Sequence, residues 1–333
     1  MEFSVFFAGP DDDGRRLDRI IRKKAESVCI SSVYSAIRKG LIKVNEKKTS
    51  AEQRIKSGDK ISIAAFLLHA EQENVLHDSY SKNFAPSSDT IPQIKFETVF
   101  QNEFLKIINK PYDVNVHGTN SLASVIEQSY KKESFGTSLS FTPGPLHRLD
   151  KKTTGLLVFS NSISGAVWFS KAISDKVIRK FYIGICQGIF QNRQLWNDYI
   201  IPDSERKSNF YTMKIDCSCT DRKNLASTVC TPLAEGIYKN KKITLCQFEI
   251  LTGKKHQIRC QSAFHGIHLL GDTAYGAEKI FEKQDFFLHA YKMIFPKDNP
   301  CSIPEELSAS VPKNYQEFLT LSLIKWDGRI IIN

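Results

Sequence analysis

The sequence predicts a chain of two domains, each built from both helices and strands. Its 333 residues exceed the usual size of one domain, and hydrophobic residues make up 41% of them, enough for a sizeable core. Helical and alternating apolar patterns lie on both sides of a stretch rich in Ser, Asn, Asp and Pro. We therefore expect a small domain at residues 1–66, a linker at 67–95 and a larger domain at 96–333.

The small domain opens with two predicted helices. RLDRIIRKKAESV, which begins at Arg16, spaces its apolar residues along one side of a helix. In the following SSVYSAIRKG, Ser31 or Ser32 can cap a second helix and Gly40 can end it. LIKVN and GDKISIAAF then read as strands that begin or end at turns. The apolar run at 61–68 is far too short to span a bilayer, so we interpret it as a strand.

The balance of charge indicates an anionic partner. Lys and Arg number 46 against 36 Asp and Glu, a net charge of +10. Residues 1–63 hold 14 of the basic and 9 of the acidic residues, so this fifth of the chain carries half the net charge. Nucleic acid and an anionic membrane surface both fit, and a solvated helical face is the alternative. The basic side chains near the two helices and the turn are Arg15, Arg16, Arg19, Arg22, Lys23, Arg38, Lys39, Lys43, Lys47 and Lys48.

The amino terminus and the cysteines indicate the compartment and the metal content. MEFSVFFAGPDDDG has an acidic triplet and lacks a basic start before a long apolar run, so we expect no signal peptide and a cytoplasmic protein. The eight cysteines are scattered, and CSC at 217–219 lacks the spacing of a zinc site. We therefore expect free thiols, no metal and no association with a membrane.

In the large domain, an apolar strand follows an isolated acid. TGLLVFS at 154–160 is apolar enough for the middle of a sheet, which places Asp150 in the loop at its start. Asp150 stands beside His147 and Arg148, so it either neutralises a surface loop or is a carboxylate kept ionised for chemistry. The next segment has Ile163, Val167, Ile173 and Val177 at near-helical spacing.

KFYIGICQG then alternates as a strand that ends at Gly188. Tyr182 would share one side of this strand with Gly184 and Cys186. Because these neighbours are small, we expect open space above the sheet there, which is the first sign of a cleft. Further along, residues 241–276 predict a strand, a turn, a helix from about Lys255 to Phe264 and a loop punctuated by glycine.

Four ordered motifs give the chain a family resemblance. HRLDKKTTGLLVFS at 147–160, KFY at 180–182, LTGKKHQIR at 251–259 and HLLGDTAYG at 268–276 together resemble the RluA-type family of RNA pseudouridine synthases. Residues 16–63 are similar to the S-four-type RNA-binding domain. The resemblance implies an α+β fold in which helices flank a mixed, largely antiparallel sheet with a cleft across its middle. It also implies isomerisation of uridine to pseudouridine, without a cofactor.

The resemblance assigns the reaction to three residues. Asp150 matches the family's carboxylate, which assists cleavage of the glycosidic bond as a nucleophile on the anomeric carbon or by acting at a neighbouring position. Arg259 matches the arginine that pairs with this aspartate, although on its own it would be read as a surface or salt-bridging group. Tyr182 matches a phenol that stacks on the uracil and serves as a base or as steric support.

Further residues are expected to contact the RNA. Arg148 matches the residue that fills the stack left by the flipped base, with a plain phosphate contact as the alternative. We expect His147 to fix the loop by a hydrogen bond. Lys180 and Lys254 are expected to meet phosphate, or else to be solvated. In the small domain the expected RNA contacts are Arg16, Arg19, Arg38, Lys39 and Lys43.

The expected substrate is large-subunit ribosomal RNA or a preribosome, bound by a monomer. The small domain and VHG at 116–118 favour the ribosomal, RluC-like branch. A transfer-RNA enzyme and a non-catalytic RNA-binding assembly protein are the alternatives. The chain departs from the family at Cys260 and Gln261, where an apolar residue and a His are usual, and at GKK, where GR is usual. The polar stretch 128–144 is also long, and we expect a loop near the site entrance there.

Overall fold

A computed structural model describes residues 2–25, 28–68, 94–133, 138–204, 211–280, 282 and 285–322. Its contacts divide the chain into two compact units. The N-terminal unit comprises Met1–Gln93, Ser124–Gly144 and Ser162–Ser164, and the C-terminal unit comprises Ile94–Ala123, Pro145–Asn161 and Gly165–Asn333. Most of the predicted linker, residues 69–93, lies outside the described residues. The predicted domain boundaries therefore stay a prediction.

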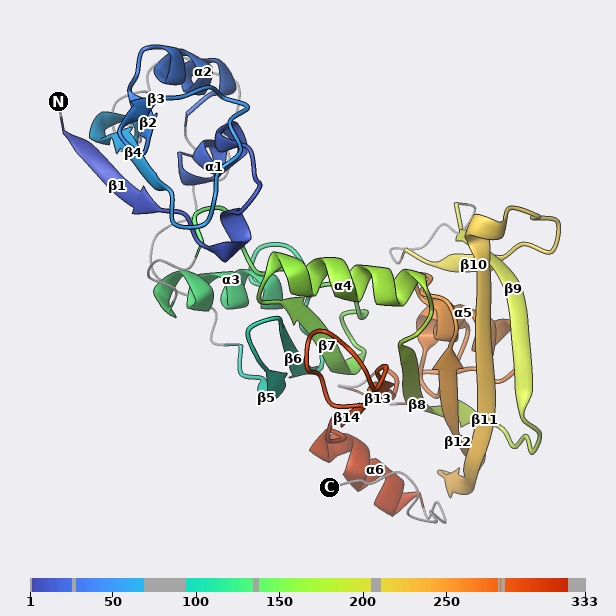
Figure 1. The fold of residues 1–333 in the computed structure, drawn as a ribbon. Helices are drawn as coiled ribbons and strands as arrows, with labels where there is room; N and C mark the ends of the chain where they lie inside the picture. The colour runs from blue at the N-terminus through green and yellow to red at the C-terminus, as the bar shows by residue number, and fades with distance from the viewer. Residues whose placement is uncertain are drawn as a thin grey trace. The chain divides into compact units, whose positions relative to one another are not determined.

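The N-terminal unit contains a small antiparallel sheet with two helices (Figure 1). The strands pair in the order β1-β4-β2-β3. Their bounds are β1 Phe3–Phe7, β2 Ile42–Val44, β3 Lys47–Lys48 and β4 Lys60–Ala64. The helices are α1 Leu17–Lys24 and α2 Ile30–Arg38, with short 3-10 turns η1 Pro10–Asp12 and η2 Ala65–Leu67.

The local predictions for this unit hold in part. Both helices and the two predicted strands are present, but β1 was not predicted. Gly40 ends α2 as expected, because its φ of 73° turns the chain into the left-handed region. The predicted capping was wrong: Ser31 and Ser32 lie inside α2, and the capping position is Cys29, whose side chain makes no cap hydrogen bond. The apolar run at 61–68 is a strand only to Ala64 and continues as η2.

The core of the N-terminal unit draws on a distant stretch of sequence. Leu17 and Ile20 of α1, Ile37 of α2 and Ile63 of β4 are all buried together. Leu139 joins them from the polar stretch 128–144. The buried Asp12 carboxylate accepts hydrogen bonds from the Leu139 N–H at 2.7 Å and the Ser140 hydroxyl at 2.6 Å. This part of the stretch packs within the N-terminal unit, and the expectation of a loop near the site entrance stays a prediction. Residues 134–137 lie outside the described residues.

The C-terminal unit is built on a large mixed sheet (Figure 1). Its strand order is β10-β9-β11-β12-β8-β13-β7-β6-β5, and β14 pairs with β13. Every pairing is antiparallel except that of β13 with β7, which confirms the mixed, largely antiparallel α+β fold. The strands are β5 Glu97–Gln101, β6 Leu105–Lys110, β7 Thr154–Ser160, β8 Arg179–Gln187, β9 Gln194–Pro202, β10 Met213–Ile215, β11 Leu225–Tyr238, β12 Lys241–Ile250, β13 Leu288–Ile294 and β14 Glu306–Ser308. The remaining helices are α3 Leu122–Glu133, which lies in the N-terminal unit from Ser124 onward, α4 Ile163–Ser174, which lies in the C-terminal unit from Gly165 onward, and α5 Gln257–Phe264 and α6 Lys313–Leu321. The 3-10 turns of the C-terminal unit are η3 Arg222–Asn224 and η4 Thr273–Tyr275.

Strand β7 lies in the middle of this sheet, as its sequence predicts. It is buried along its whole length between β6 and β13. Leu156 and Val158 pack against Phe169 of α4. The buried face of α4 differs from the predicted one, because Val167 is 63% exposed while Gly165 and Phe169 are buried. Gly165 has this place because a side chain there would collide with the backbone of Phe104.

The open space predicted above Gly184 and Cys186 is filled. A Cβ on Gly184 would lie 3.1 Å from side-chain atoms of Phe248 and Leu269 and 3.3 Å from Leu288. Cys186 is fully buried. This face of β8 is therefore packed core at Gly184 and Cys186, where the prediction of open space was wrong, whereas Tyr182 on the same face lines a pocket. The small residues admit large side chains from other strands and loops rather than a substrate.

Within the described residues, no helix is long and apolar enough to cross a membrane. The same residues contain no group of three or more His, Cys, Asp and Glu side chains that could hold a metal ion.

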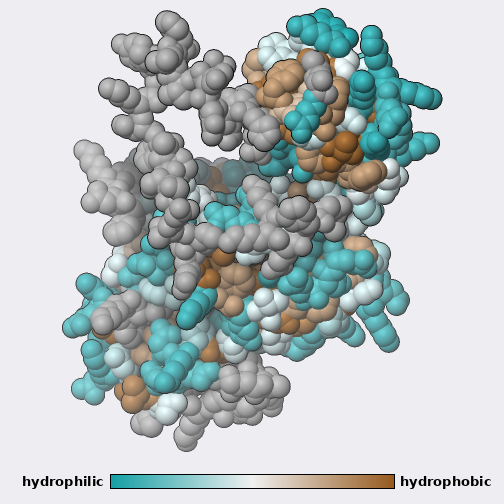
Figure 2. Space-filling model, turned by 90° about the vertical axis from the view of Figure 1, so that its left-hand side faces the viewer, coloured by the Kyte–Doolittle hydropathy of each residue, from teal (hydrophilic) through white to brown (hydrophobic). Residues whose placement is uncertain are grey.

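Figure 2 shows hydrophobic surface on the N-terminal unit beside hydrophilic side chains. In that unit Val5 and Phe7 of the edge strand β1 are 45% and 61% exposed.

Candidate active site

The loop before β7 carries Asp150 to the rim of a pocket. Just after this loop, at the start of β7, Gly155 has a φ of 107° and lies against the backbone of Ala290 in β13. Any side chain at this position would collide with the Ala290 carbonyl, so only glycine lets β7 and β13 approach this closely. The Asp150 carbonyl accepts a hydrogen bond from the Thr153 N–H at 3.0 Å, which closes the turn.

His147 attaches the same loop to the sheet. Its Nε2 accepts a hydrogen bond from the Val158 N–H in β7 at 3.1 Å, and its ring stacks on Phe169. Burial, assisted by the charge of Lys180, lowers the pKa of His147 to about 3. The imidazole is thus neutral and free to accept this bond. Its neighbour Arg148 is exposed and lines the pocket.

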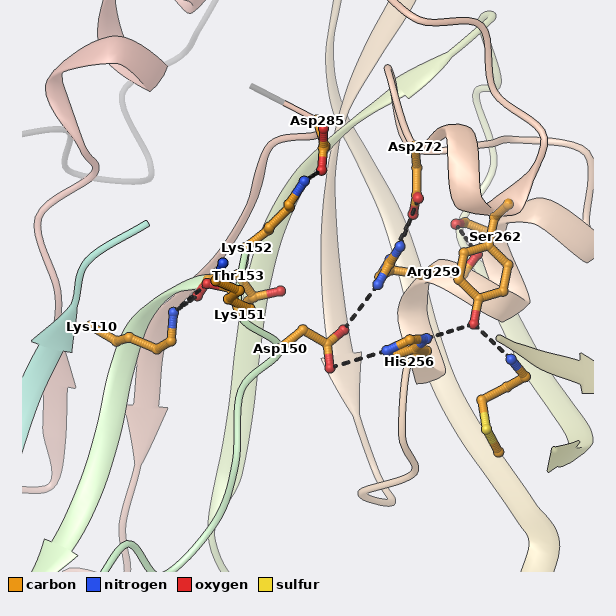
Figure 3. Close-up of polar contacts among 12 residues, drawn as sticks. Lys110, Asp150, Lys151, Lys152, Thr153, His256, Arg259, Ser262, Asp272 and Asp285 are labelled. Atoms are coloured by element: carbon orange, nitrogen blue, oxygen red, sulfur yellow. Dashed lines mark hydrogen bonds and ion pairs between the residues drawn. The ribbon is translucent and has the colours of Figure 1, made fainter. Parts of the chain in front are cut away.

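A buried lysine supports the loop from below, and the sequence analysis missed it. Lys110, the last residue of β6, is fully buried. Its ammonium donates to the carbonyl oxygens of Lys151 at 2.7 Å and Thr153 at 2.9 Å (Figure 3). It also donates to the Pro111 carbonyl oxygen at 2.9 Å. Burial lowers the pKa of Lys110 to about 7, and the charge of Asp150 opposes this shift. Three carbonyl acceptors match the three N–H groups of the charged form.

Arg259 lies opposite Asp150, with its Nη1 3.5 Å from the Asp150 Oδ2. Its Nε and Nη2 donate to the two oxygens of the buried Asp272 at 2.7 and 2.8 Å. The guanidinium also lies over the rings of Tyr275 and Phe286, at 4.9 and 4.5 Å from their centres. Burial disfavours the charge, but the hydrogen bonds and charge of Asp272 outweigh it and raise the pKa of Arg259.

Without a known partner, Arg259 was expected to be a surface or salt-bridging group. The surface position was wrong, because this side chain is almost completely buried. The helix that carries it begins at Gln257 rather than Lys255. The residue before this helix, His256, has a φ of 53°, so the chain turns sharply just before Arg259. The partner of Arg259 is Asp272, which lies in the motif GDTAYG. The sequence alone assigned no role to this aspartate.

His256 is the second group beside the carboxylate. Its Nε2 lies 3.7 Å from the Asp150 Oδ1 (Figure 3). Its Nδ1 lies 2.8 Å from the Tyr275 hydroxyl, which also accepts the Met213 N–H at 3.0 Å. Burial lowers the pKa of His256 to about 4, although the charge of Asp150 opposes this. The sequence analysis did not single out His256, although it stands in the HQIR motif.

Tyr182 of β8 completes the pocket, which opens to solvent. Tyr182 is buried, and burial together with the charge of Asp150 raises its pKa. The side chain of Asp150 is 18% exposed, so an incoming group can reach it. The polar side chains that line the pocket belong to Arg148, Asp150, Thr153, Tyr182, Lys254, His256, Gln257 and Arg259.

The other expected RNA contacts are distributed over both units. Lys180 is half-buried two residues before Tyr182, and burial lowers its pKa. In the N-terminal unit Arg16 donates to Asp18 at 2.8 Å, so its charge is partly matched. Lys43 is half-buried, with its ammonium 4.9 Å from the ring centre of Phe3. Arg19, Arg38 and Lys39 are exposed.

The departure from the family at Gln261 has a structural explanation. Gln261 lies in α5, and its side chain is fully buried. Its amide donates to the Asp198 carboxylate at 2.6 Å and to the Ala226 carbonyl at 3.2 Å, and its oxygen accepts from the Thr228 hydroxyl at 2.6 Å. These bonds fix α5 to β9 and β11. The helix that carries Arg259 is therefore anchored without a histidine at this place.

Comparison with known proteins agrees with the geometry. Residues 105–264 match the family described as RNA pseudouridylate synthase, and this range contains Asp150, Tyr182 and Arg259. The chain is 29% identical over 279 residues to "Ribosomal large subunit pseudouridine synthase C" of Buchnera aphidicola subsp. Schizaphis graminum, covering 82% of this chain and 81% of that protein. It is 27% identical over 298 residues to the protein of the same name in Haemophilus influenzae, covering 86% and 84%.

Solved structures share the fold. "Human RNA Pseudouridylate Synthase Domain Containing 1" superposes with a TM-score of 0.55 at 21% identity, over 68% of this chain and 87% of that one. "Human RNA Pseudouridylate Synthase Domain Containing 4" gives a TM-score of 0.54 at 21% identity, over 69% and 94%. Residues 105–264 thus carry the match to the RNA pseudouridylate synthase family, and the chain resembles pseudouridine synthases, which are isomerases, over most of its length.

Proposed function

We propose that this protein converts uridine to pseudouridine in large-subunit ribosomal RNA, and that Asp150 is its nucleophile. The observation that carries the proposal is a partly exposed carboxylate at a pocket, with an arginine beside one oxygen and a histidine beside the other. The ribosomal substrate is supported by the relatives named "Ribosomal large subunit pseudouridine synthase C".

The proposed reaction needs no group beyond side chains and the RNA. A carboxylate oxygen of Asp150 attacks C1′ of the ribose, and N1 of the uracil leaves with the electron pair of the glycosidic bond. The uracil turns within the pocket, and C5 attacks C1′ and displaces the carboxylate. C5 then loses its proton and N1 gains one, so the atoms of the nucleotide are conserved.

Arg259 is the charged partner of the nucleophile. The guanidinium is held by Asp272, which leaves Nη1 directed at Asp150 at 3.5 Å. The positive charge attracts the Asp150 carboxylate at this distance. Because Asp272 fixes the guanidinium plane, the charge is preorganised and does not have to move when the substrate binds.

Tyr182 is assigned to the support of the uracil ring. Its pKa is raised by burial and by the charge of Asp150, which keeps the phenol protonated at neutral pH. A protonated phenol is a poor base. Of the two roles expected for this residue, packing against the flipped base therefore fits its surroundings better than proton abstraction.

Base flipping is assigned to the exposed Arg148 at the rim of the pocket. A planar guanidinium can take the place of the extruded base in the stack. His147 holds the loop that presents Arg148. Lys254 and Lys180 are proposed to contact phosphates next to the flipped nucleotide.

The N-terminal unit is proposed to bind RNA as an S-four-type domain. Its exposed Arg19, Arg38 and Lys39 offer charges that phosphate groups can neutralise. Arg16 is assigned a smaller contribution than the sequence suggests, because Asp18 already accepts two of its hydrogen bonds.

Incubation with unmodified ribosomal RNA tests the proposal, with new pseudouridines mapped as carbodiimide-resistant stops of reverse transcription. We expect stops in the large-subunit RNA with the wild type and none with Asp150→Asn. Asp113→Asn is the matched control, since this exposed acid pairs with Lys151 on the surface. Stops in transfer RNA alone would reassign the substrate. An unchanged yield with Asp150→Asn would contradict the mechanism, and no stops at all would favour a non-catalytic RNA-binding protein.

A further inference from the structure

The loop Gly271–Gly276 reaches both neighbours of Asp150. Left-handed glycines stand at each end of it, with φ of 87° at Gly271 and 90° at Gly276. Between them, Asp272 holds Arg259, and the Tyr275 ring lies under the same guanidinium. The Tyr275 hydroxyl turns to His256 instead. One short loop therefore supports Arg259 through Asp272 and His256 through Tyr275.

The hydrogen bonds of Tyr275 determine which nitrogen of His256 carries the proton. The Met213 N–H can only donate, so the hydroxyl oxygen accepts from it. In the described part of the chain, the acceptor available to the Tyr275 proton is the Nδ1 of His256 at 2.8 Å. If Nδ1 carried a proton instead, the buried hydroxyl proton would lose this acceptor, which is unfavourable. The imidazole proton therefore belongs on Nε2.

The environment of Nε2 supports the same assignment. This nitrogen lies 3.7 Å from the Asp150 Oδ1. An N–H is attracted to a carboxylate, whereas a lone pair would be repelled by it. Burial also keeps the ring neutral, with a pKa of about 4. The site thus presents a neutral donor to one oxygen of Asp150 and the charged Arg259 to the other.

We propose that His256 is a positioning residue, held by Tyr275 as the tautomer protonated on Nε2, which orients the Asp150 carboxylate through Oδ1. This inference rests on the proposed function of Asp150 as nucleophile. A neutral donor fixes the plane of the carboxylate without adding a second full charge that would weaken its attack. The left-handed backbone at His256 brings the ring into the pocket just before α5 begins.

The tautomer can be read directly from the protein without RNA. Long-range ¹H–¹⁵N correlation spectra of ¹⁵N-histidine-labelled protein at neutral pH report which ring nitrogen is protonated, and His256→Gln assigns the signal. We expect the proton on Nε2, a shift of this proton in Asp150→Asn, and a mixture of tautomers in Tyr275→Phe. A proton on Nδ1 in the wild type would overturn the inference. So would an Nε2 proton that does not respond to Asp150→Asn.

Single-turnover and steady-state kinetics on ribosomal RNA give the second test. We expect His256→Leu to lower kcat by about 10- to 100-fold and Tyr275→Phe by about 3- to 10-fold, both with little change in KM. His256→Gln keeps an N–H near the position of Nε2 and should recover most of kcat. A positioning role is contradicted if Gln is as poor as Leu, or if KM alone changes.

Tyr291→Phe is the matched control for Tyr275→Phe. Tyr291 is also buried, and its hydroxyl donates one hydrogen bond to Gln247 at 2.7 Å. Tyr291→Phe should lose about as much stability as Tyr275→Phe but keep the kcat of the wild type. If kcat falls equally in both variants, the fall in Tyr275→Phe comes from lost stability and not from the position of His256. Failure of the wild type to form pseudouridine would refute the proposed function. In that case the spectra still decide the state of His256.

Discussion

Replacing Asp272 by Asn should weaken both the fold and the site, because Arg259 would lose the charge that matches it. Asp272 is 2% exposed and Arg259 is 9% exposed, and two hydrogen bonds of 2.7 and 2.8 Å join them. Removing one partner of a buried ion pair costs about 3–5 kcal/mol. Asn keeps one acceptor for the guanidinium, so we expect a loss at the lower end, about 3 kcal/mol.

Urea unfolding measures this loss, and the chain offers a matched control. Arg179 and Glu249 form the same two-point pair, at 2.7 and 3.2 Å, but Arg179 is 54% exposed. Glu249→Gln should therefore cost less than about 1 kcal/mol. Because Arg259 also faces Asp150, we expect Asp272→Asn, unlike Glu249→Gln, to lower kcat/KM by about 10-fold or more. Equal losses of stability in the two variants would refute the argument from burial.

Three further variants test other parts of the molecule. In the wild type the pKa of Lys110 is about 7 in the folded state and about 10.4 in the unfolded state. The free energy of unfolding of the wild type should therefore rise between about pH 7 and 10. Lys110→Met should remove this rise, as urea midpoints measured across that range would show. Gly155→Ala should prevent folding, whereas Gly118→Ala, which has a similar φ and no neighbour within 4 Å, should cost about 1 kcal/mol by thermal melting. Arg38→Gln combined with Lys39→Gln should reduce the salt dependence of RNA binding in filter assays, and an unchanged slope would exclude this surface from binding.

The sequence was informative where a single segment determines the outcome. The apolar run at 154–160 became a buried central strand, and Asp150 lies in the loop before it, as predicted. The face of β8 that carries Phe181, Ile183 and Ile185 joins one core cluster, as alternation predicts. These results need only the period of the strand.

The sequence was less informative where the answer depends on segments far away. Arg259 on its own read as a surface or salt-bridging group. Its salt-bridge partner Asp272 could not be named, because it is 13 residues away and meets Arg259 only after the intervening loop folds back. Lys110 ends one strand, yet its acceptors Lys151 and Thr153 lie 41 and 43 residues later. Small residues on β8 suggested a cleft, but the side chains that fill this space come from other strands and loops.

The position of β13 in the sheet has a consequence for synthesis of the protein. Asp150 precedes β7 and Tyr182 lies on β8, and β13, residues 288–294, is inserted between these two strands. A ribosome therefore completes every residue of the proposed catalytic set before it makes the strand that joins them. A growing chain that ends before β13 holds its carboxylate and its tyrosine on strands that cannot yet be neighbours. We therefore expect a chain cut before β13 to be unable to modify RNA, because modification requires β13 to join the two strands.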